Sequence, residues 1–343
     1  MKPLLVLVGG FLGAGKTTLI LRAAGLLREE GLRVAVITND QDGSLVDTKV
    51  SEAHGLPTRE VAGGCFCCRF ADLLDAAEAL RSFGPDVIFA EPVGSCVDLS
   101  ATIMQPLKST YGDRFRLAPL TVLIDPALAA RVWSGYANPD VSFLFRNQLA
   151  EADLVCETKA DTGKNACATV AVDFRLSSVT GEGVREWLAE VRNSSRITGA
   201  HMLELDYGQY AAAEAALAWL NLHADVRLDG FSSPAVLAGS LLDEMDRMLT
   251  EDGVPIAHLK VFDCASSGYV KAGICANGEE PLPEGDLAAS PQRRHELVVN
   301  LRAIGDPDRI QGIVRRAFET VEGEVTVRHV RSFRPPAPDV TNR

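Results

Sequence analysis

Short apolar runs separated by helical patterns fill the first half of the chain. Residues 4–8 are apolar throughout and are followed by glycine, as expected for a strand buried on both faces. Residues 16–30 carry apolar positions at helical spacing, and Gly31 ends that pattern. Further strands are expected at 33–38, 86–90, 120–125, 154–157 and 169–173, with helices between most of them, for instance at 71–83 and 97–111. This alternation predicts a mostly parallel sheet covered by helices on both faces, the α/β class.

The pattern changes after Asn193, where two serines follow. Strands are expected at 218–228, 258–264, 269–275, 296–303 and 325–332, and helices at 234–250 and 308–320. This order fits a small split-βαβ sheet with helices on one face. The Gly-, Pro- and acid-rich stretch 277–292 is interpreted as an exposed loop, and the proline-rich tail 334–343 as frayed. We therefore expect a larger domain over residues 1–195 and a smaller α+β C-terminal domain over residues 196–343.

The composition narrows the classes of function. Acidic residues outnumber basic ones by 46 to 34, and the formal net charge is −12, the opposite of the basic excess typical of a non-specific nucleic-acid binder. No apolar run reaches the ~18 residues that a membrane-spanning helix needs. We expect a cytoplasmic protein that has neither nucleic acid nor a membrane as a partner. The 8 cysteines are too few for a disulfide scaffold of a chain this long.

A phosphate-binding loop is the strongest motif. Residues 10–17 match G-x-x-x-x-G-K-[ST], with a strand expected before them and a helix after. The glycines let backbone N–H groups point at phosphate oxygens, while Lys16 would neutralise the β and γ phosphates and Thr17 would supply an oxygen to Mg²⁺. The expected nucleotide contacts are Gly10, Gly13, Ala14, Gly15, Lys16, Thr17 and Thr18. Residues 4–12 also resemble a short signal peptide, but cleavage there would destroy the loop.

Two acidic residues at strand ends are expected to act beside the phosphates. Glu91 follows the apolar run that ends at residue 90, where a carboxylate can lie close to Mg²⁺ and the attacking water. Gly94, three residues later, would offer its backbone N–H to the γ-phosphate. Asp40 follows the second strand and would contact Mg²⁺ from a switch loop that reaches Asp47, although a plain polar turn fits this stretch equally well.

A base-recognition motif follows the strand at 154–157. Thr158, Lys159 and Asp161 stand where guanine-binding proteins carry Asn-Lys-x-Asp. The aspartate would accept two hydrogen bonds that guanine donates and adenine does not, and the lysine stem would pack along the base. Ser178 lies in a second loop expected to contact the base. The alternative is a helix start followed by an ordinary turn.

Three cysteines crowd into four positions. Cys65, Cys67 and Cys68 are soft thiolate ligands suited to Zn²⁺, Co²⁺, Ni²⁺ or Cu⁺. No second CxxC or HxxxH pair accompanies them, so we expect an open site that can transfer metal rather than a closed structural one. His54 is a candidate fourth ligand, although a lone histidine is more often structural. The alternative is that the three thiols are buried or redox-active. The remaining cysteines, Cys96, Cys156, Cys167, Cys264 and Cys275, are expected to be small core residues.

The order of these motifs resembles that of the CobW-like GTPases, which are similar in their nucleotide domain to the nickel-enzyme maturation GTPases UreG and HypB. The resemblance covers roughly residues 1–190 and implies a P-loop GTPase domain over residues 1–195. It further implies GTP and Mg²⁺ as cofactors, with GTP hydrolysis coupled to delivery of a transition metal or to maturation of a metal- or cobalamin-dependent client enzyme. Two departures are Thr158 in place of Asn and the lack of a histidine-rich tract, so bulk metal storage is not expected.

Three other functions stay open at this point. The chain could be a nucleotide-dependent activator of a corrinoid or methyltransferase system in which the cysteines are structural. It could be a nucleoside or metabolite kinase, although no lid or substrate motif is apparent. It could also be a nucleotide-gated binding module that does not hydrolyse GTP. The sequence identifies neither the metal nor the client, and it leaves open whether a homodimer forms.

Overall fold

The computed structural model of the chain describes residues 2–43, 46–163 and 170–340. These residues form two compact units. The first unit comprises residues 1–41, 51–214 and 337–343, and the second comprises residues 42–50 and 215–336. None of the helices in the described part of the chain combines the length and the apolarity that crossing a bilayer requires.

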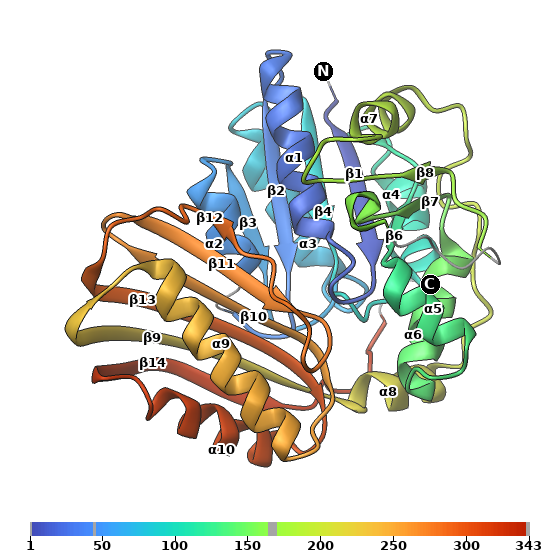
Figure 1. Cartoon of the computed structure of the whole chain (residues 1–343). Helices are drawn as coiled ribbons and strands as arrows, with labels where there is room; N and C mark the ends of the chain where they lie inside the picture. Colours follow the sequence, from blue (N-terminus) through green and yellow to red (C-terminus); the bar gives the residue numbers. More distant parts are fainter. Residues whose placement is uncertain (1, 44–45, 164–169, 341–343) are drawn as a thin grey trace. The chain divides into compact units, whose positions relative to one another are not determined.

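A parallel sheet forms the centre of the first unit (Figure 1). Among the described residues it has eight strands, in the order β3-β2-β4-β1-β6-β7-β8 with β5 paired to β1. The strands are β1 (Leu4–Gly10), β2 (Val34–Asn39), β3 (Thr58–Val61), β4 (Val87–Glu91), β5 (Arg116–Leu117), β6 (Thr121–Ile124), β7 (Leu154–Glu157) and β8 (Phe174–Arg175). Because all pairs are parallel, the carboxyl ends of these strands meet at one edge of the sheet.

Helices flank this sheet on both faces, with α1 in front of it and α3 behind it in Figure 1. The helical segments are α1 (Lys16–Glu29), α3 (Phe70–Arg81), a π-helix (Ser100–Met104), α4 (Gln105–Thr110), α5 (Pro126–Trp133), α6 (Pro139–Glu151), a 3₁₀ turn (Ala160–Thr162), α7 (Val184–Asn193) and α8 (Tyr207–Ala215). Trp187 on α7 is fully buried, stacks on Phe89 and donates its indole N–H to Thr121 Oγ1 at 3.1 Å. The α/β class expected from the sequence is confirmed.

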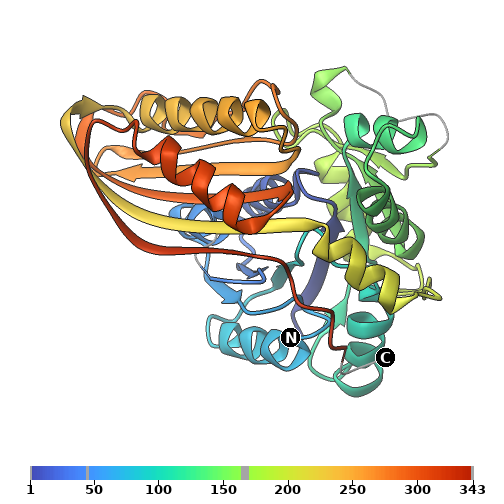
Figure 2. The same cartoon turned by 90° about the horizontal axis from the view of Figure 1, so that it is seen from below.

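An antiparallel sheet forms the second unit, in the order β12-β11-β10-β13-β9-β14. Its strands are β9 (Leu217–Ser232), β10 (Ile256–Ala265), β11 (Gly268–Ile274), β12 (Glu284–Gly285), β13 (Gln292–Ile304) and β14 (Gly323–Phe333). The helices α9 (Pro234–Glu251) and α10 (Pro307–Phe318) lie on one face of it (Figure 2). Since β13 lies between β9 and β10, the topology is the expected split βαβ.

The opposite face of this second sheet receives the segment that follows β2, residues 42–50. Asp47 forms an ion pair with Lys260 of β10, with an Nζ–Oδ1 distance of 2.6 Å. The backbone N–H of Val46 donates to Asn300 Oδ1 at 2.8 Å. The segment contains the first part of helix α2 (Val46–Ala53), so a stretch expected to be a switch loop belongs to the second unit.

The division between the units differs from the boundary expected at residues 195 and 196. Helix α7 does end there, but the chain that follows continues to pack on the first unit as far as Glu214. Arg196 forms an ion pair with Asp173 at 2.7 Å, and the Gly199 N–H donates to Asp153 Oδ2 at 2.6 Å. The break in the strand–helix alternation therefore marks the end of the repeating strand–helix units, not the end of the packed unit.

Smaller differences concern three expected segments. The helix expected from residue 97 begins at Ser100, as a π-helix. The stretch 277–292 contains the short strand β12. Thr169, the first residue of the strand expected at 169–173, lies outside the described residues, as does Cys167, and the next strand in the structure is β8.

Candidate nucleotide and metal site

The phosphate-binding loop joins β1 to α1, and its glycines are required by the backbone. Gly10 has φ +131°, and a Cβ there would lie 2.5 Å from the carbonyl oxygen of Leu123. Gly15 has φ +86° and begins the helix from the left-handed region. A side chain at either position would be strained, and at Gly10 it would also collide with β6.

The charged and hydroxyl groups of the loop are buried and already paired. The Lys16 ammonium donates to the carbonyl oxygens of Gly10 and Phe11, at 2.9 and 3.3 Å. The Thr17 hydroxyl donates to Glu91 Oε1 at 3.0 Å. Since β4 is the neighbour of β1, the sheet brings Glu91 to the first turn of α1. Two residues expected around Mg²⁺ thus lie together, while Thr18 is half-buried on the next position of the helix.

The segment after Glu91 packs directly on the phosphate loop. A Cβ at Gly94 would come within 2.6 Å of Leu12 Cδ2 and 3.1 Å of the Leu12 nitrogen. Gln148 of α6 holds the segment from the other side, donating to the carbonyl oxygens of Gly94 and Cys96 at 3.0 and 2.9 Å. Any displacement of the loop at Leu12 must therefore affect residues 94–96.

The expected base-recognition residues gather at the ends of β6 and β7. The Thr158 hydroxyl donates to the carbonyl oxygen of Ala14, at 2.9 Å, and so ties this motif to the phosphate loop. Lys159 has φ +57° and forms an ion pair with Asp125 at 2.5 Å. Asp161 accepts a hydrogen bond of 2.6 Å from Ser177. Asp125 was not singled out in the sequence, whereas Ser177 and Ser178 begin the second loop expected to contact the base, and Ser178 is half-buried.

Asp40 lies at the end of β2 and is buried. Its carboxylate accepts the backbone N–H of Gln41 at 2.6 Å, and its carbonyl oxygen accepts the N–H of Gly64 at 3.4 Å. Residue 40 is therefore joined to the loop that carries the cysteines. Of the switch loop expected between Asp40 and Asp47, residues 44 and 45 lie outside the described residues.

The three cysteines of the CxCC motif form one cluster. Their sulfur atoms all lie within 4.8 Å of one another, with Cys65–Cys67 at 2.6 Å, Cys65–Cys68 at 3.3 Å and Cys67–Cys68 at 3.8 Å. Asn39 holds the loop from β2, because its amide donates to the Gly64 carbonyl at 2.8 Å and its oxygen accepts the Phe66 N–H at 2.8 Å. The arrangement is suited to a thiophilic cation.

Burial and hydrogen bonding distinguish Cys68 from its neighbours. Cys65 and Cys67 are buried, whereas Cys68 is half-exposed. The hydrogen bond with Cys65 raises the pKa of Cys68 to about 11, so a bound cation must displace its proton at neutral pH. The backbone of Asp339 also hydrogen-bonds the Cys68 thiol. The tail expected to be frayed thus reaches the cysteine cluster at residue 339.

The structure also places the other cysteines and the candidate fourth ligand. Cys96 is buried, as expected of a core residue, and its sulfur lies 3.7 Å from that of Cys67, a contact that the sequence did not indicate. His54, a candidate fourth ligand, is exposed and does not belong to the cluster. Among the other described cysteines, Cys156 is buried in β7, and Cys264 and Cys275 belong to the second unit.

Two buried glutamates near Cys96 were not singled out as candidates from the sequence. Burial raises the pKa of Glu151 and of Glu214 to about 8. Glu151 accepts the backbone N–H of Ser100 at 2.9 Å, at the start of the π-helix, and Glu214 accepts the Ser95 hydroxyl at 2.7 Å. Glu151 continues the apolar face of α6, so its position in the helical period was a usable signal.

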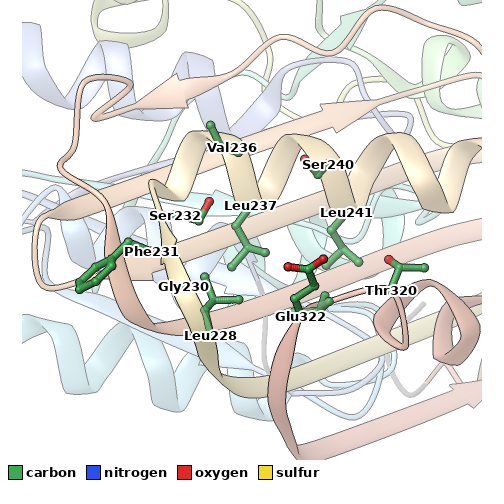
Figure 3. A pocket seen from close by; sticks show the side chains of 11 residues that line it. Leu228, Gly230, Phe231, Ser232, Val236, Leu237, Ser240, Leu241, Thr320 and Glu322 are labelled. Carbon is green, nitrogen blue, oxygen red and sulfur yellow. The ribbon is translucent and has the colours of Figure 1, made fainter.

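The second unit contains a separate pocket of about 230 Å³ beside the start of α9 (Figure 3). Its lining is largely apolar and includes the exposed Phe231 and Val236, while Glu322 is its one ionisable residue. None of the nucleotide or metal candidates lines it. The residues expected to contact nucleotide or to ligate the transition metal through thiols lie in the first unit.

The sequence of this chain is similar to those of known proteins. Residues 4–182 match the family model described as the CobW/HypB/UreG nucleotide-binding domain. The zinc chaperone YeiR of Escherichia coli is 30% identical over 162 residues, covering 45% of this chain and 46% of YeiR. The zinc chaperone YjiA of Escherichia coli is 36% identical over 176 residues, covering 48% of this chain and 52% of YjiA. The chain therefore spans about half the length of the curated relatives it matches.

Solved structures give a more distant likeness. The crystal structure of HypB from Helicobacter pylori in complex with nickel matches with 17% identity and a TM-score of 0.42. The match covers 59% of this chain and 92% of that chain.

Proposed function

The chain belongs to the CobW/HypB/UreG family through its nucleotide-binding domain, and from that premise we propose that it is a GTP-hydrolysing metallochaperone. The observation that carries the proposal is the three-thiol cluster in the same unit as the phosphate loop. Asn39 and Gly94, which touch the cysteine loop and the phosphate loop respectively, extend from neighbouring strands. Such proximity gives a nucleotide the means to alter a metal site.

The phosphate loop would hold Mg²⁺-GTP. The loop backbone and Lys16 suit the β and γ phosphates, and Gly94, which packs against Leu12 of the loop, would offer its N–H to the γ-phosphate. The Thr17 hydroxyl and the Glu91 carboxylate, 3.0 Å apart, are hard oxygen donors that fit Mg²⁺. Asp40 would help to orient Mg²⁺ or water from the end of β2. Mg²⁺ would neutralise charge that develops on the phosphates during hydrolysis.

Asp161 would select guanine. Its carboxylate is oriented by Ser177, and Lys159 is oriented by Asp125. Thr158 retains the contact with the phosphate loop through its hydroxyl, so loss of the usual Asn amide need not separate the base site from the phosphate site. We infer preference for GTP over ATP by a modest margin.

We infer that the metal it carries is zinc, because the relatives YeiR and YjiA are named zinc chaperones. Thiolates also bind Co²⁺ and Ni²⁺, and affinity alone does not select zinc. The second unit would recognise a client, either a metalloenzyme or a cobalamin-related protein, in the cytoplasm. A homodimer is compatible with this scheme but not required by it.

Zinc release is the direct test of this function. The protein loaded with one zinc ion is mixed with a chromophoric chelator in the presence of GTP, a non-hydrolysable GTP analogue, GDP or ATP. We expect the rate of zinc release to depend on the nucleotide and to differ most between the GTP-bound and GDP-bound protein, with ATP less effective than GTP. The Cys65→Ser, Cys67→Ser, Cys68→Ser triple variant is the control for binding elsewhere. Identical release rates under all four conditions would contradict a nucleotide-driven chaperone.

A further inference from the structure

We propose that Cys96 is a fourth thiolate ligand of the metal, which converts the CxCC cluster into a four-sulfur site. The proposal rests on the metallochaperone function and adds a ligand from a different strand. Cys65, Cys67 and Cys68 come from the loop after β3, whereas Cys96 follows β4, 29 residues from Cys67. A metal held in this way would link the two loops directly.

Two of the sulfur–sulfur distances have the length that tetrahedral coordination requires. Zn–S bonds of about 2.3 Å place the sulfurs of a tetrahedral site about 3.8 Å apart. The Cys67–Cys68 distance is 3.8 Å and the Cys67–Cys96 distance is 3.7 Å, so two edges already have this length. Cys65, at 2.6 Å from Cys67, must turn outward to admit an ion. Cys96 must approach, because it is not one of the three thiols whose sulfurs all lie within 4.8 Å of one another.

Burial explains why a thiol and not water would fill the fourth position. Cys67 and Cys96 are buried at 0% and 1% exposure. Helix α8 contributes the fully buried Tyr210, whose hydroxyl accepts the backbone N–H of Val97 at 3.3 Å. Cys68 is the one half-exposed thiol of the four. The metal would therefore enter and leave past Cys68, with Cys96 closing the inner side.

The position of Cys96 also depends on the nucleotide loop. Gly94, two residues before it, packs against Leu12, and Gln148 holds the carbonyl oxygens of Gly94 and Cys96 together. A γ-phosphate that draws Gly94 toward it would shift Cys96 relative to Cys67. Four thiolates form a closed site that retains zinc, and three form an open site that a client ligand can join. Nucleotide state would thereby set the number of sulfurs around the metal.

The number of sulfur ligands is measurable without an activity assay. The full-length wild-type protein is loaded with one equivalent of Zn²⁺, and X-ray absorption is used to count its ligands. Four sulfurs at about 2.3 Å are expected, and three sulfurs with one nitrogen or oxygen at about 2.0–2.2 Å would overturn the proposal. This measurement needs no variant and so does not depend on the folding of one.

A cobalt titration of Cys96→Ser adds an independent readout. The sulfur-to-cobalt charge-transfer absorption should fall by about a quarter, for one thiolate in four. Affinity should fall by more than the roughly 10- to 100-fold that loss of an outer partner costs. Cys156→Ser, which removes an equally buried thiol on β7, should change neither quantity. Equal spectra and affinities for wild type and Cys96→Ser would reject Cys96 as a ligand and leave the three-thiol chaperone intact. Absence of the charge-transfer band from the wild type would reject both proposals.

Discussion

Asp47 receives the Lys260 ammonium on both carboxylate oxygens, at 2.6 and 2.7 Å, and this contact fastens the segment after β2 to the sheet of the second unit. Both side chains are largely buried, so the pair is less screened by solvent than a surface pair. The same segment continues directly from Asp40, a candidate for contact with Mg²⁺. A nucleotide-dependent displacement of Asp40 would therefore be passed along the backbone to residues 42–50 of the second unit.

Lys260→Met should loosen residues 46–50, because it leaves the Asp47 carboxylate partly buried without its cation. Hydrogen exchange followed by mass spectrometry should show faster exchange in peptides covering α2. Lys271→Met is a matched control, since Lys271 pairs with Glu284 on another edge of the same sheet. Unchanged exchange in α2 of the Lys260 variant would show that this ion pair does not hold the segment.

Lys16→Ala should abolish GTP turnover and leave the protein folded. The ammonium donates to two carbonyl oxygens of its own loop, so the substitution removes hydrogen bonds within the loop and we expect little loss of stability. Phosphate release is the readout, with circular dichroism and thermal unfolding as checks on the fold. A folded variant with undiminished hydrolysis would remove the phosphate loop from the mechanism.

Asp161→Asn should weaken GTP binding and reduce discrimination against other purines. Loss of hydrogen bonds to a charged acceptor costs about 1.5–3 kcal/mol, or roughly 10- to 150-fold in affinity. Thr158→Asn is the companion variant and should tighten guanine preference if the amide can replace the hydroxyl contact with Ala14. Competition binding with GTP, ITP and ATP measures both. Equal affinity of the wild type for GTP and ATP would contradict guanine recognition.

Glu151→Gln should change how stability depends on pH. Burial raises the pKa of Glu151 to about 8, above that of the unfolded chain. The neutral carboxyl is therefore favoured in the fold, and its contribution is fully present below about pH 4.5 and lost as the pH rises through 8. The wild-type melting temperature should fall between pH 6 and 9, and the fall should be smaller in Glu151→Gln, which cannot ionise. Parallel curves for the two proteins would mean that Glu151 does not titrate in this range.

The sequence correctly predicts features that depend on residues close together along the chain. The phosphate loop was recognisable because Gly10 and Gly15 meet backbone constraints within eight residues of Thr17. The alternation of apolar runs was also sufficient for the α/β class. Both signals lie within a short window, so no knowledge of distant packing was needed.

Contacts between distant loops were not predictable in the same way. The meeting of Cys96 with Cys67 depends on β3, a four-residue strand with three polar positions that the apolar pattern did not reveal. Without β3, the cysteine loop could not be assigned to the same sheet edge as the end of β4. Residues 42–50 belong to the second unit because of side-chain pairs such as Asp47 with Lys260. These two residues are 213 positions apart in the sequence. No pattern along the chain encodes such a pair.

Coupling between nucleotide and metal is the central claim, and a metal titration of the apo, GDP-bound and GTP-analogue-bound protein tests it most directly. If the nucleotide rearranges the thiols, Zn²⁺ affinity should differ between these states by roughly 5- to 150-fold, and zinc should alter nucleotide affinity by the same factor. The triple variant with Cys65, Cys67 and Cys68 changed to serine should lose this binding in every state. Equal zinc affinity in all three nucleotide states would contradict nucleotide-gated transfer, and unchanged affinity in the triple variant would contradict the thiol site itself.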